Sequence, residues 1–227
     1  MIYRHPIPGI FLSRPNRFIA MVQVKGQVHR CHVKNTGRCK ELLLPGVPLI
    51  LDKAANPARL TPYDVVAVYK GDTLINIDSS APNKAFGEYL QSGGFLPGLT
   101  IIRPETKFGD SRFDFYAETS DKKIFIEIKG VTLEEDGVAL FPDAPTLRGT
   151  KHLGELARAV SLGYESHAVF VIQMKGCSLF RPNHRTDAAL AHALVQAAQA
   201  GVHLWALDCQ VTESSMEIGN PVRIELE

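Results

Sequence analysis

Residues 112–129 read RFDFYAETSDKKIFIEIK, and this stretch decides the fold of the second half of the chain. It predicts two strands, Arg112 to Ala117 and Lys123 to Lys129, because both segments are rich in aromatic and β-branched residues. The polar residues between them, Glu118 to Lys122, are typical of a turn. The stretch therefore predicts a β-hairpin.

Side chains alternate between the two faces of a strand, and this rule sorts the residues of the hairpin. Glu127 and Lys129 are expected on one face of the second strand, with the three isoleucines of that strand on the other. In the first strand, Phe113 and Phe115 are expected to share a face opposite Asp114. The charged side chains are thus separated from most of the apolar ones.

The register of the hairpin brings two carboxylates together. A turn centred on Ser120-Asp121 pairs residues whose numbers sum to 241, which places Asp114 opposite Glu127. Their Cβ atoms would lie about 4.5–5.5 Å apart, and like charges at that distance destabilise a sheet. A divalent cation removes this cost, and oxygen ligands with open positions suit Mg²⁺ or Mn²⁺. Lys129 can hold an attacking water or neutralise charge on a phosphate, so the three residues indicate metal-assisted phosphodiester hydrolysis.

An acid-x-Lys pattern on a strand is also common by chance, and an exposed, charged edge strand would carry it equally well. The paired Asp114 and the order of helices and strands around it favour the catalytic interpretation. Two further acids, Glu88 and Glu105, are candidates for a third metal ligand, and we prefer Glu88 because it lies on a predicted helix. An ordinary glutamate on a helix surface is an equally good account of that residue.

The elements on either side of the hairpin predict two domains, 1–78 and 79–227. The first contains five predicted strands, which indicate a small barrel of the oligonucleotide-binding (OB) type: Phe18–Val24, Gln27–Val33, Val47–Leu51, Tyr63–Tyr69 and Leu74–Asp78. In the second, helical periodicity and apolar runs alternate and predict a sheet flanked by helices: helices Pro82–Gln91, Thr150–Leu162 and Ala188–Ala200, and strands His167–Met174 and Val202–Leu207. The chain is therefore expected to have a mixed α/β fold.

Charge is distributed unevenly along the chain. Residues 1–59 hold ten basic and two acidic residues, a formal charge of +8, whereas residues 60–227 hold 15 basic and 22 acidic residues, a charge of −7. A basic module on an acidic remainder suggests an anionic partner such as nucleic acid, although charges scattered over a solvated surface would give the same asymmetry. The loop Asn35-Thr36-Gly37-Arg38 could bind a phosphate, although Asn and Gly also suit an ordinary turn. Lys151, on the second predicted helix, either lies on a solvated face or reaches a substrate phosphate.

Composition excludes several classes of protein. The chain has no run of 18 apolar residues and no signal-peptide pattern, so we expect no membrane partner and a cytoplasmic location. Four scattered cysteines, which are expected to be reduced, form no usual zinc pattern: Cys31, Cys39, Cys177 and Cys209. The sequence carries no signal for an oligomeric state.

Five motifs occur in order along the chain: Asn35-Thr36-Gly37, Arg112-Phe113-Asp114-Phe115, Glu127-Ile128-Lys129, Phe141-Pro142-Asp143-Ala144, and Arg148-Gly149-Thr150-Lys151-His152-Leu153-Gly154-Glu155-Leu156. On these motifs the chain resembles the bacterial sugar fermentation stimulation protein A family along nearly its whole length. The resemblance implies an OB-like barrel, a C-terminal domain similar to the PD-(D/E)xK nucleases, DNA binding, and a link to the regulation of sugar-utilisation genes.

The resemblance places a nuclease-like site on Asp114, Glu127 and Lys129, with Glu88 as the acid from the helix. Phe113 stands where the nuclease pattern has a proline. Together with the charge distribution, the resemblance leads us to expect that eight residues bind nucleic acid: Arg14, Arg17, Lys34, Asn35, Thr36, Arg38, Lys40 and Lys151.

Three functions are compatible with these residues. The first is a nuclease that requires Mg²⁺ or Mn²⁺, which the complete acid–acid–lysine set favours. The second is a DNA-binding regulator that keeps the nuclease-like scaffold without turnover, although no helix-turn-helix is recognisable. The third is a carbohydrate enzyme, because carboxylates about 5–5.5 Å apart suit a retaining glycosidase. A single tryptophan and the otherwise unexplained Lys129 argue against this last function.

Overall fold

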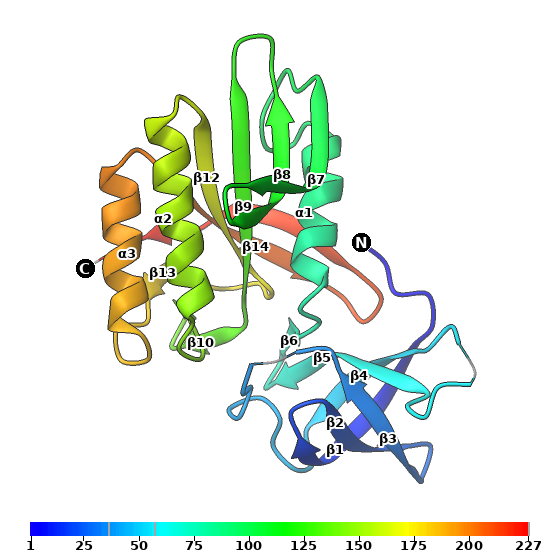
Figure 1. The fold of residues 1–227 in the computed structure, drawn as a ribbon. Helices are drawn as coiled ribbons and strands as arrows, with labels where there is room; N and C mark the ends of the chain where they lie inside the picture. The colour runs from blue at the N-terminus through cyan, green and yellow to red at the C-terminus, as the bar shows by residue number, and fades with distance from the viewer. Residues whose placement is uncertain (36, 57, 227) are drawn as a thin grey trace.

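A small barrel and a larger sheet with helices on both faces make up the molecule (Figure 1). The computed structural model describes residues 1–35, 37–56 and 58–226. Barrel strands lie in the first third of the chain, and all three helices follow them. The structure therefore confirms the predicted mixed α/β fold, with a barrel followed by an α/β domain.

Five strands close the N-terminal barrel in the order β1–β2–β3–β5–β4, with β4 returning to β1. Closure depends on the parallel pairing of β3 with β5, while the other barrel pairs are antiparallel. Because the barrel is closed, alternate residues of each strand point into its core. A sixth strand pairs with β5 outside the barrel. The six strands are β1 (Pro6–Asn16), β2 (Ile19–Val24), β3 (Gln27–Val33), β4 (Pro48–Lys53), β5 (Tyr63–Lys70) and β6 (Thr73–Asn76).

The sequence predicts the right number of barrel strands but not the right set. The last predicted strand, Leu74 to Asp78, corresponds to β6, which pairs only with β5 and takes no part in the closure. Its place is taken by β1, which was missed because Pro6, Pro8 and Gly9 are depleted in strands. The predicted turn between β2 and β3 is confirmed. Lys25 and Gly26 have φ values of 49° and 83°, and a two-residue type I′ hairpin requires positive φ at both positions.

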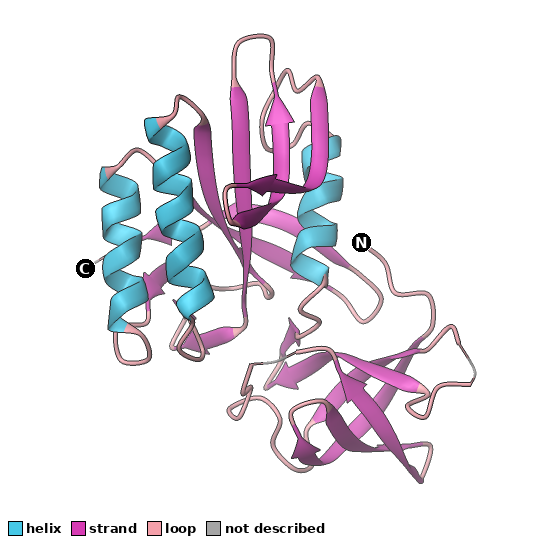
Figure 2. Cartoon of the chain, viewed as in Figure 1, coloured by secondary structure: helices cyan, strands magenta, loops and turns pink. Residues whose placement is uncertain are grey.

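The C-terminal domain is built on a six-stranded sheet of order β15–β14–β12–β9–β8–β7. Its central strands β9, β12 and β14 are parallel and are connected through α2 and α3. Helix α1 packs on one face of the sheet, and α2 and α3 pack on the other (Figures 1 and 2). These elements are α1 (Ala81–Gln91), β7 (Ile101–Phe108), β8 (Ser111–Glu118), β9 (Lys123–Val131), α2 (Leu147–Ser161), β12 (Glu165–Ile172), α3 (Ala188–Gln199), β14 (His203–Val211) and β15 (Met216–Pro221).

Four short strands form a third sheet of order β10–β11–β13–β16, in segments for which the sequence predicted no strands. They are β10 (Leu133–Glu135), β11 (Val138–Phe141), β13 (Leu179–Pro182) and β16 (Arg223–Ile224). The three predicted helices are confirmed, with α2 starting three residues earlier than expected. Thr146 caps that start by accepting a hydrogen bond from the Gly149 amide, which fixes where the helix begins.

The register predicted for the β8–β9 hairpin is confirmed. Residue numbers sum to 241 in every observed pair, from Glu118 with Lys123 to Phe115 with Ile126. The regular ladder ends there, and Asp114 and Glu127 are the next residue on each strand. The amide of Ile128 donates to Asp114 Oδ2, at 2.7 Å, so a side chain continues the contact between the strands.

One expectation about β8 is wrong. Phe113 and Phe115 do not share a face: Phe113 packs against Phe125 on the α2 side of the sheet, and Phe115 packs against Phe86 of α1. The regular alternation is interrupted at Asp114, where the paired ladder to β9 ends. A residue in an irregular strand position breaks the period of two, as it does in a β-bulge.

A group of polar residues joins the barrel to the C-terminal domain. The Asn76 amide donates to the Gln173 carbonyl oxygen at 2.9 Å, and Gln173 Nε2 donates back to the Asn76 carbonyl at 2.9 Å. Asp78, in the segment between β6 and α1, accepts hydrogen bonds from Lys34 Nζ and from the Ser80 amide, both at 2.9 Å. Every bond is short and the side chains are buried or half-buried, so the two domains are held by specific contacts.

Across the described residues, no helix combines the length and the apolar character that a membrane crossing requires.

Candidate metal and nucleic-acid site

Glu127 and Lys129 project from β9 toward α2, as the predicted alternation requires. Glu127 is 3% exposed, and a carboxylate at that depth is costly unless it is paired. Lys129 Nζ lies 2.5 Å from Glu127 Oε1, and the lysine side chain is only 17% exposed. The two residues form a nearly buried ion pair.

His152 also contacts Glu127, and sequence reasoning missed its role. Its Nδ1 contacts Glu127 Oε1 from the buried face of α2. Arg148, one turn earlier on the same helix, donates from Nε to His152 Nε2 at 3.4 Å. The sequence carries a signal for the burial of His152, because this residue lies four and seven residues before Leu156 and Ala159, both of which are buried.

Asp114 is held by two donors that come from different elements. Asn83 Nδ2, near the start of α1, donates to Asp114 Oδ1 at 2.6 Å, and the Ile128 amide donates to Oδ2. Burial, followed by the negative charge of Glu127, raises the pKa of Asp114 to about 6. The role of Asn83 had no signal in the sequence, since nothing in a single polar residue on a helix indicates its partner.

The two carboxylates have pKa values that are shifted in opposite directions. Burial alone would raise the pKa of Glu127, but the hydrogen bonds from His152 and Lys129 and the charge of Lys129 outweigh it, so this pKa lies below its usual value. Among the described residues, no donor reaches Glu127 Oε2, although that atom is buried. A buried, unpartnered carboxylate oxygen beside a second carboxylate fits a hard divalent cation, which takes oxygen ligands.

Glu88 faces the same cleft as Asp114, whereas Glu127 does not line that cleft. Glu88 lines this cleft, of about 330 Å³, together with Asp114, Asn83 and Glu105. Glu88 is also largely exposed and lies 2.6 Å from the Met1 amino group. Within the described parts of the chain, no three His, Cys, Asp or Glu side chains converge closely enough to hold a metal. The structure thus brings Glu88 and Glu105 to the same cleft as Asp114, but it does not bring either into a three-ligand cluster.

Four of the basic residues predicted to bind nucleic acid line a single cleft of the barrel. Arg14, Arg17, Arg38 and Lys40 surround a cavity of about 460 Å³ that contains no acidic side chain. Arg14 supports its wall, because its guanidinium donates to the main-chain oxygens of four residues. Arg17, Arg38 and Lys40 are exposed, and none of them forms a salt bridge with any residue that the structure describes.

The remaining predicted contacts are placed differently. Lys34 is paired with Asp78, at 2.9 Å, so much of its charge is used within the protein. Asn35 donates to the Ile77 carbonyl and accepts from the Gly37 amide, which is the turn geometry considered as the alternative. Thr36 lies outside the described residues. Lys151 is exposed on α2, and its Nζ lies 3.3 Å from the Asp110 carbonyl.

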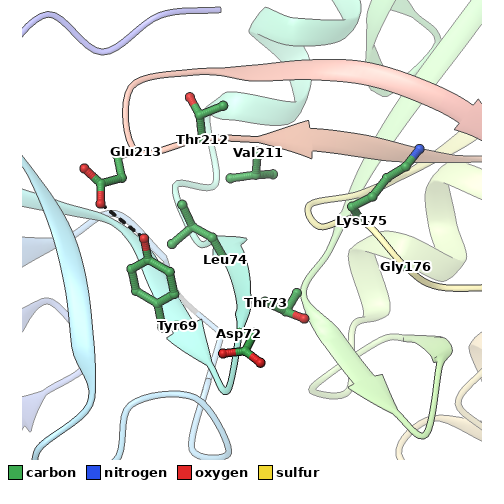
Figure 3. A pocket seen from close by; sticks show the side chains of 9 residues that line it. All are labelled: Tyr69, Asp72, Thr73, Leu74, Lys175, Gly176, Val211, Thr212 and Glu213. Atoms are coloured by element: carbon green, nitrogen blue, oxygen red, sulfur yellow. Dashed lines mark hydrogen bonds between the residues drawn. The ribbon is translucent and has the colours of Figure 1, made fainter.

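A separate cavity of about 480 Å³ lies where the β5–β6 turn of the barrel faces the C-terminal domain (Figure 3). The Tyr69 hydroxyl donates to Glu213 Oε1 across it, at 3.2 Å. None of the predicted site residues lines this cavity. This cavity is therefore separate from the carboxylate site.

The fold and the site define a protein in which a closed five-stranded barrel is joined to an α/β domain with a buried carboxylate–lysine pair. The chain belongs to the sugar fermentation stimulation protein family. The family model described as the SfsA N-terminal OB domain matches residues 12–77, and the one described as the sugar fermentation stimulation protein RE domain matches residues 80–215.

Similar proteins match the whole chain. A sugar fermentation stimulation protein homolog from Desulfitobacterium hafniense strain Y51 is 55% identical over 226 residues, covering 100% of this chain and 99% of that protein. A homolog from Ruminiclostridium cellulolyticum is 48% identical, covering 100% of both chains. The solved structure of Pyrococcus furiosus SfsA, described as a complex with Ca²⁺, aligns with a TM-score of 0.90 at 30% identity, covering 99% of this chain and 98% of that one.

Proposed function

We propose that this chain is a DNA-binding protein whose C-terminal domain cleaves phosphodiesters with the help of Mg²⁺ or Mn²⁺. In this proposal Asp114 and Glu127 hold the cation, Lys129 acts beside them, and the basic cleft of the barrel binds the nucleic-acid backbone. The observation that carries the proposal is the buried Glu127 Oε2, which has no donor among the described residues.

The Glu127 Oε2 atom supports the proposal of a bound metal, because a buried carboxylate oxygen left without a partner is costly. An unpartnered buried polar group costs about 1–3 kcal/mol, and more when it is charged. Asp114 adds a second carboxylate, whose pKa is raised by its burial and by the nearby charge of Glu127. A domain that only binds DNA gains nothing from two buried acids beside each other, whereas a divalent cation removes both the repulsion and the missing contact.

The residues of the site divide the work of hydrolysis. When bound, the cation would supply Lewis-acid polarisation of a phosphoryl oxygen. Asn83 and the Ile128 amide keep Asp114 in place, since each donates to one of its oxygens. Lys129 is positioned to donate to charge that develops on the phosphate, because its ammonium is nearly buried and lies against Glu127.

The Pyrococcus furiosus relative supports the metal part of the proposal, since its structure is described as a complex with Ca²⁺. Calcium and magnesium both take oxygen ligands, so a site that holds one is chemically suited to the other, subject to cavity size and rigidity. Calcium often occupies such sites without supporting turnover, so cleavage has to be tested with Mg²⁺ and Mn²⁺.

The basic cleft supports nucleic acid as the partner. Arg17, Arg38 and Lys40 present three exposed charges around one cavity without an acidic neighbour in its lining. Contacts of basic side chains with phosphates supply most of the non-specific affinity for DNA. Gly37 and Arg38 also lie in the loop that touches the C-terminal domain at Asp143, which brings the cleft to the side of the molecule where α2 begins.

One observation favours a second function, a DNA-binding regulator that does not cleave. In the described parts of the chain, no third acidic or histidine ligand joins Asp114 and Glu127. A site with two ligands would bind a cation weakly. The proposed site therefore depends on waters to complete the coordination before the substrate binds, as Mg²⁺ sites commonly do.

The test is cleavage of single- and double-stranded DNA by the purified protein with Mn²⁺, Mg²⁺ or EDTA, beside Lys129→Ala. Lys123→Ala is the matched control, because Lys123 is exposed at the start of the same strand. We expect cleavage that requires the metal, is lost in Lys129→Ala and is kept in Lys123→Ala. Binding without cleavage under every condition would make the chain a regulator on a nuclease-like scaffold.

A further inference from the structure

We propose that His152 is a positioning residue, which orients Glu127 so that one of its oxygens is kept for the cation. This inference rests on the proposed metal site and names a residue that site requires. The observation behind it is that two donors contact one oxygen of the Glu127 carboxylate and leave the other oxygen without a donor among the described residues.

Both donors bind the same oxygen. Lys129 Nζ and His152 Nδ1 each contact Glu127 Oε1, while the buried Oε2 receives no bond from any described residue. Two donors of different origin, one on β9 and one on α2, fix the plane of the carboxylate. The free oxygen then has a defined direction, which is what a ligand of a metal needs.

Arg148 decides which nitrogen of His152 can donate. Its guanidinium Nε always carries a hydrogen and donates to His152 Nε2, so that nitrogen is the acceptor. Nδ1, which faces Glu127, is therefore the nitrogen that donates. A chain of contacts thus runs from an exposed arginine at the start of α2 to the buried carboxylate.

Helix α2 gives this donor a rigid support. His152 is 5% exposed, its neighbours Leu153 and Leu156 are buried, and its ring meets Phe113 edge-on at 6.2 Å between centroids. Lys129, by contrast, reaches Glu127 from the end of a flexible four-carbon chain. Of the two donors, His152 is the one whose position is set by packing, as the support of a functional group requires.

The experiment compares His152→Asn with His152→Leu in the full chain. Asn and Leu have nearly the same shape, so both variants lose the ring equally, but only the Asn amide can donate from the position of Nδ1. Mn²⁺ binding is measured by isothermal titration calorimetry without DNA, which needs no catalytic turnover. We expect His152→Leu to weaken Mn²⁺ binding about 10- to 100-fold, the usual effect of removing a partner of a metal ligand, and His152→Asn to stay within about threefold.

Equal weakening in both variants would overturn the inference, because the ring would then act by packing alone. Unchanged affinity in His152→Leu would overturn it as well. Absence of Mn²⁺ binding by the unmodified chain would refute the proposed metal site itself, a result that differs from either of these. If the buried substitutions unfold the chain, Arg148→Met tests the same contact from an exposed position, and an unchanged Mn²⁺ affinity there counts against it.

Discussion

Gly37 of the barrel lies directly against Asp143 of the C-terminal domain. A Cβ atom added to Gly37 would overlap with Asp143 Oδ2 and would come within 2.8 Å of Asn35 Oδ1. Only a glycine fits there without a shift of its neighbours. Two motifs that are more than a hundred residues apart in the sequence therefore meet at the edge of the basic cleft.

Replacing Gly37 with alanine is expected to displace the loop that carries Arg38 and Lys40. Overpacking typically costs about 1–3 kcal/mol, and Asp143 can relieve part of it by moving its carboxylate. We expect a lower melting temperature and weaker DNA binding, measured by differential scanning fluorimetry and fluorescence anisotropy.

Gly154→Ala is the control, because nothing lies within 4 Å of a Cβ at that position on α2. Alanine should stabilise this helix by about 1 kcal/mol relative to glycine. If Gly37→Ala behaves like Gly154→Ala, the contact with Asp143 does not restrict the loop.

Adding Mg²⁺ or Mn²⁺ is expected to raise the melting temperature, since a ligand that binds only the folded state stabilises it. Asp114→Ala should abolish this gain, and an undiminished gain would remove Asp114 from the metal site. Glu88→Ala tests the helix acid in the same assay. Because Glu88 is largely exposed and paired with the Met1 amino group, we expect it to change the metal-dependent gain less than Asp114→Ala does.

DNA affinity is expected to fall steeply as salt rises, because bound phosphates release counterions. Arg38→Ala and Lys40→Ala should each reduce the slope of log affinity against log salt by about 1. Lys123→Ala, which removes an exposed lysine far along the chain from the cleft, should leave the slope unchanged. A flat salt response of the unmodified chain would show that the barrel does not bind phosphates.

His167 makes the fold sensitive to acid. Burial lowers its pKa from 6.5 to about 4, even though Glu165 accepts a hydrogen bond from it. The unfolded chain takes up this proton at a higher pH than the folded chain does. The contribution of neutral His167 to the free energy of unfolding is therefore fully present above pH 6.5. It is lost as the pH falls toward 4, by an amount on the order of 3 kcal/mol.

Urea unfolding at pH 7 and pH 4.5 measures this loss. Trp205, the only tryptophan, donates to His167 Nδ1 at 3.0 Å, so its fluorescence reports directly on the cluster. In His167→Gln the difference between the two pH values should shrink, because the titrating group is gone. An equal difference in both proteins would mean that other groups cause the acid sensitivity.

Local patterns in the sequence were sufficient for much of this fold. Polar turns and alternating apolar residues predict the β8–β9 register, because pairing in a hairpin follows from its turn. The same reasoning fails at β1, where prolines hide a strand that tertiary pairing on both sides stabilises. It also fails at Asp114, where the paired ladder to β9 ends and the Asp114 side chain accepts from the Ile128 amide instead.

The candidate site divides in the same way. The placement of Glu127 and Lys129 on one face follows from strand alternation alone. The contacts of His152 and Asn83 with the carboxylates depend on how α2 and α1 pack across the sheet, which no local pattern specifies. From the sequence, Lys34 and Arg14 were expected to contact nucleic acid. In the structure Lys34 pairs with Asp78, and Arg14 donates to main-chain oxygens.

In the proposed function, the bonds of Gln173 to the segment of Asn76 and Asp78 would affect how the molecule binds a long nucleic acid. Gln173 Nε2 reaches the carbonyl oxygens of Asn76 at 2.9 Å and of Asp78 at 3.3 Å, so the segment between the domains is clamped rather than free to swing. These bonds restrain changes in the separation between the basic cleft and the carboxylates. In the proposed function, a nucleic acid that contacts the basic cleft and the carboxylates at the same time has to match that separation, so the length of the bound segment would be set by the protein.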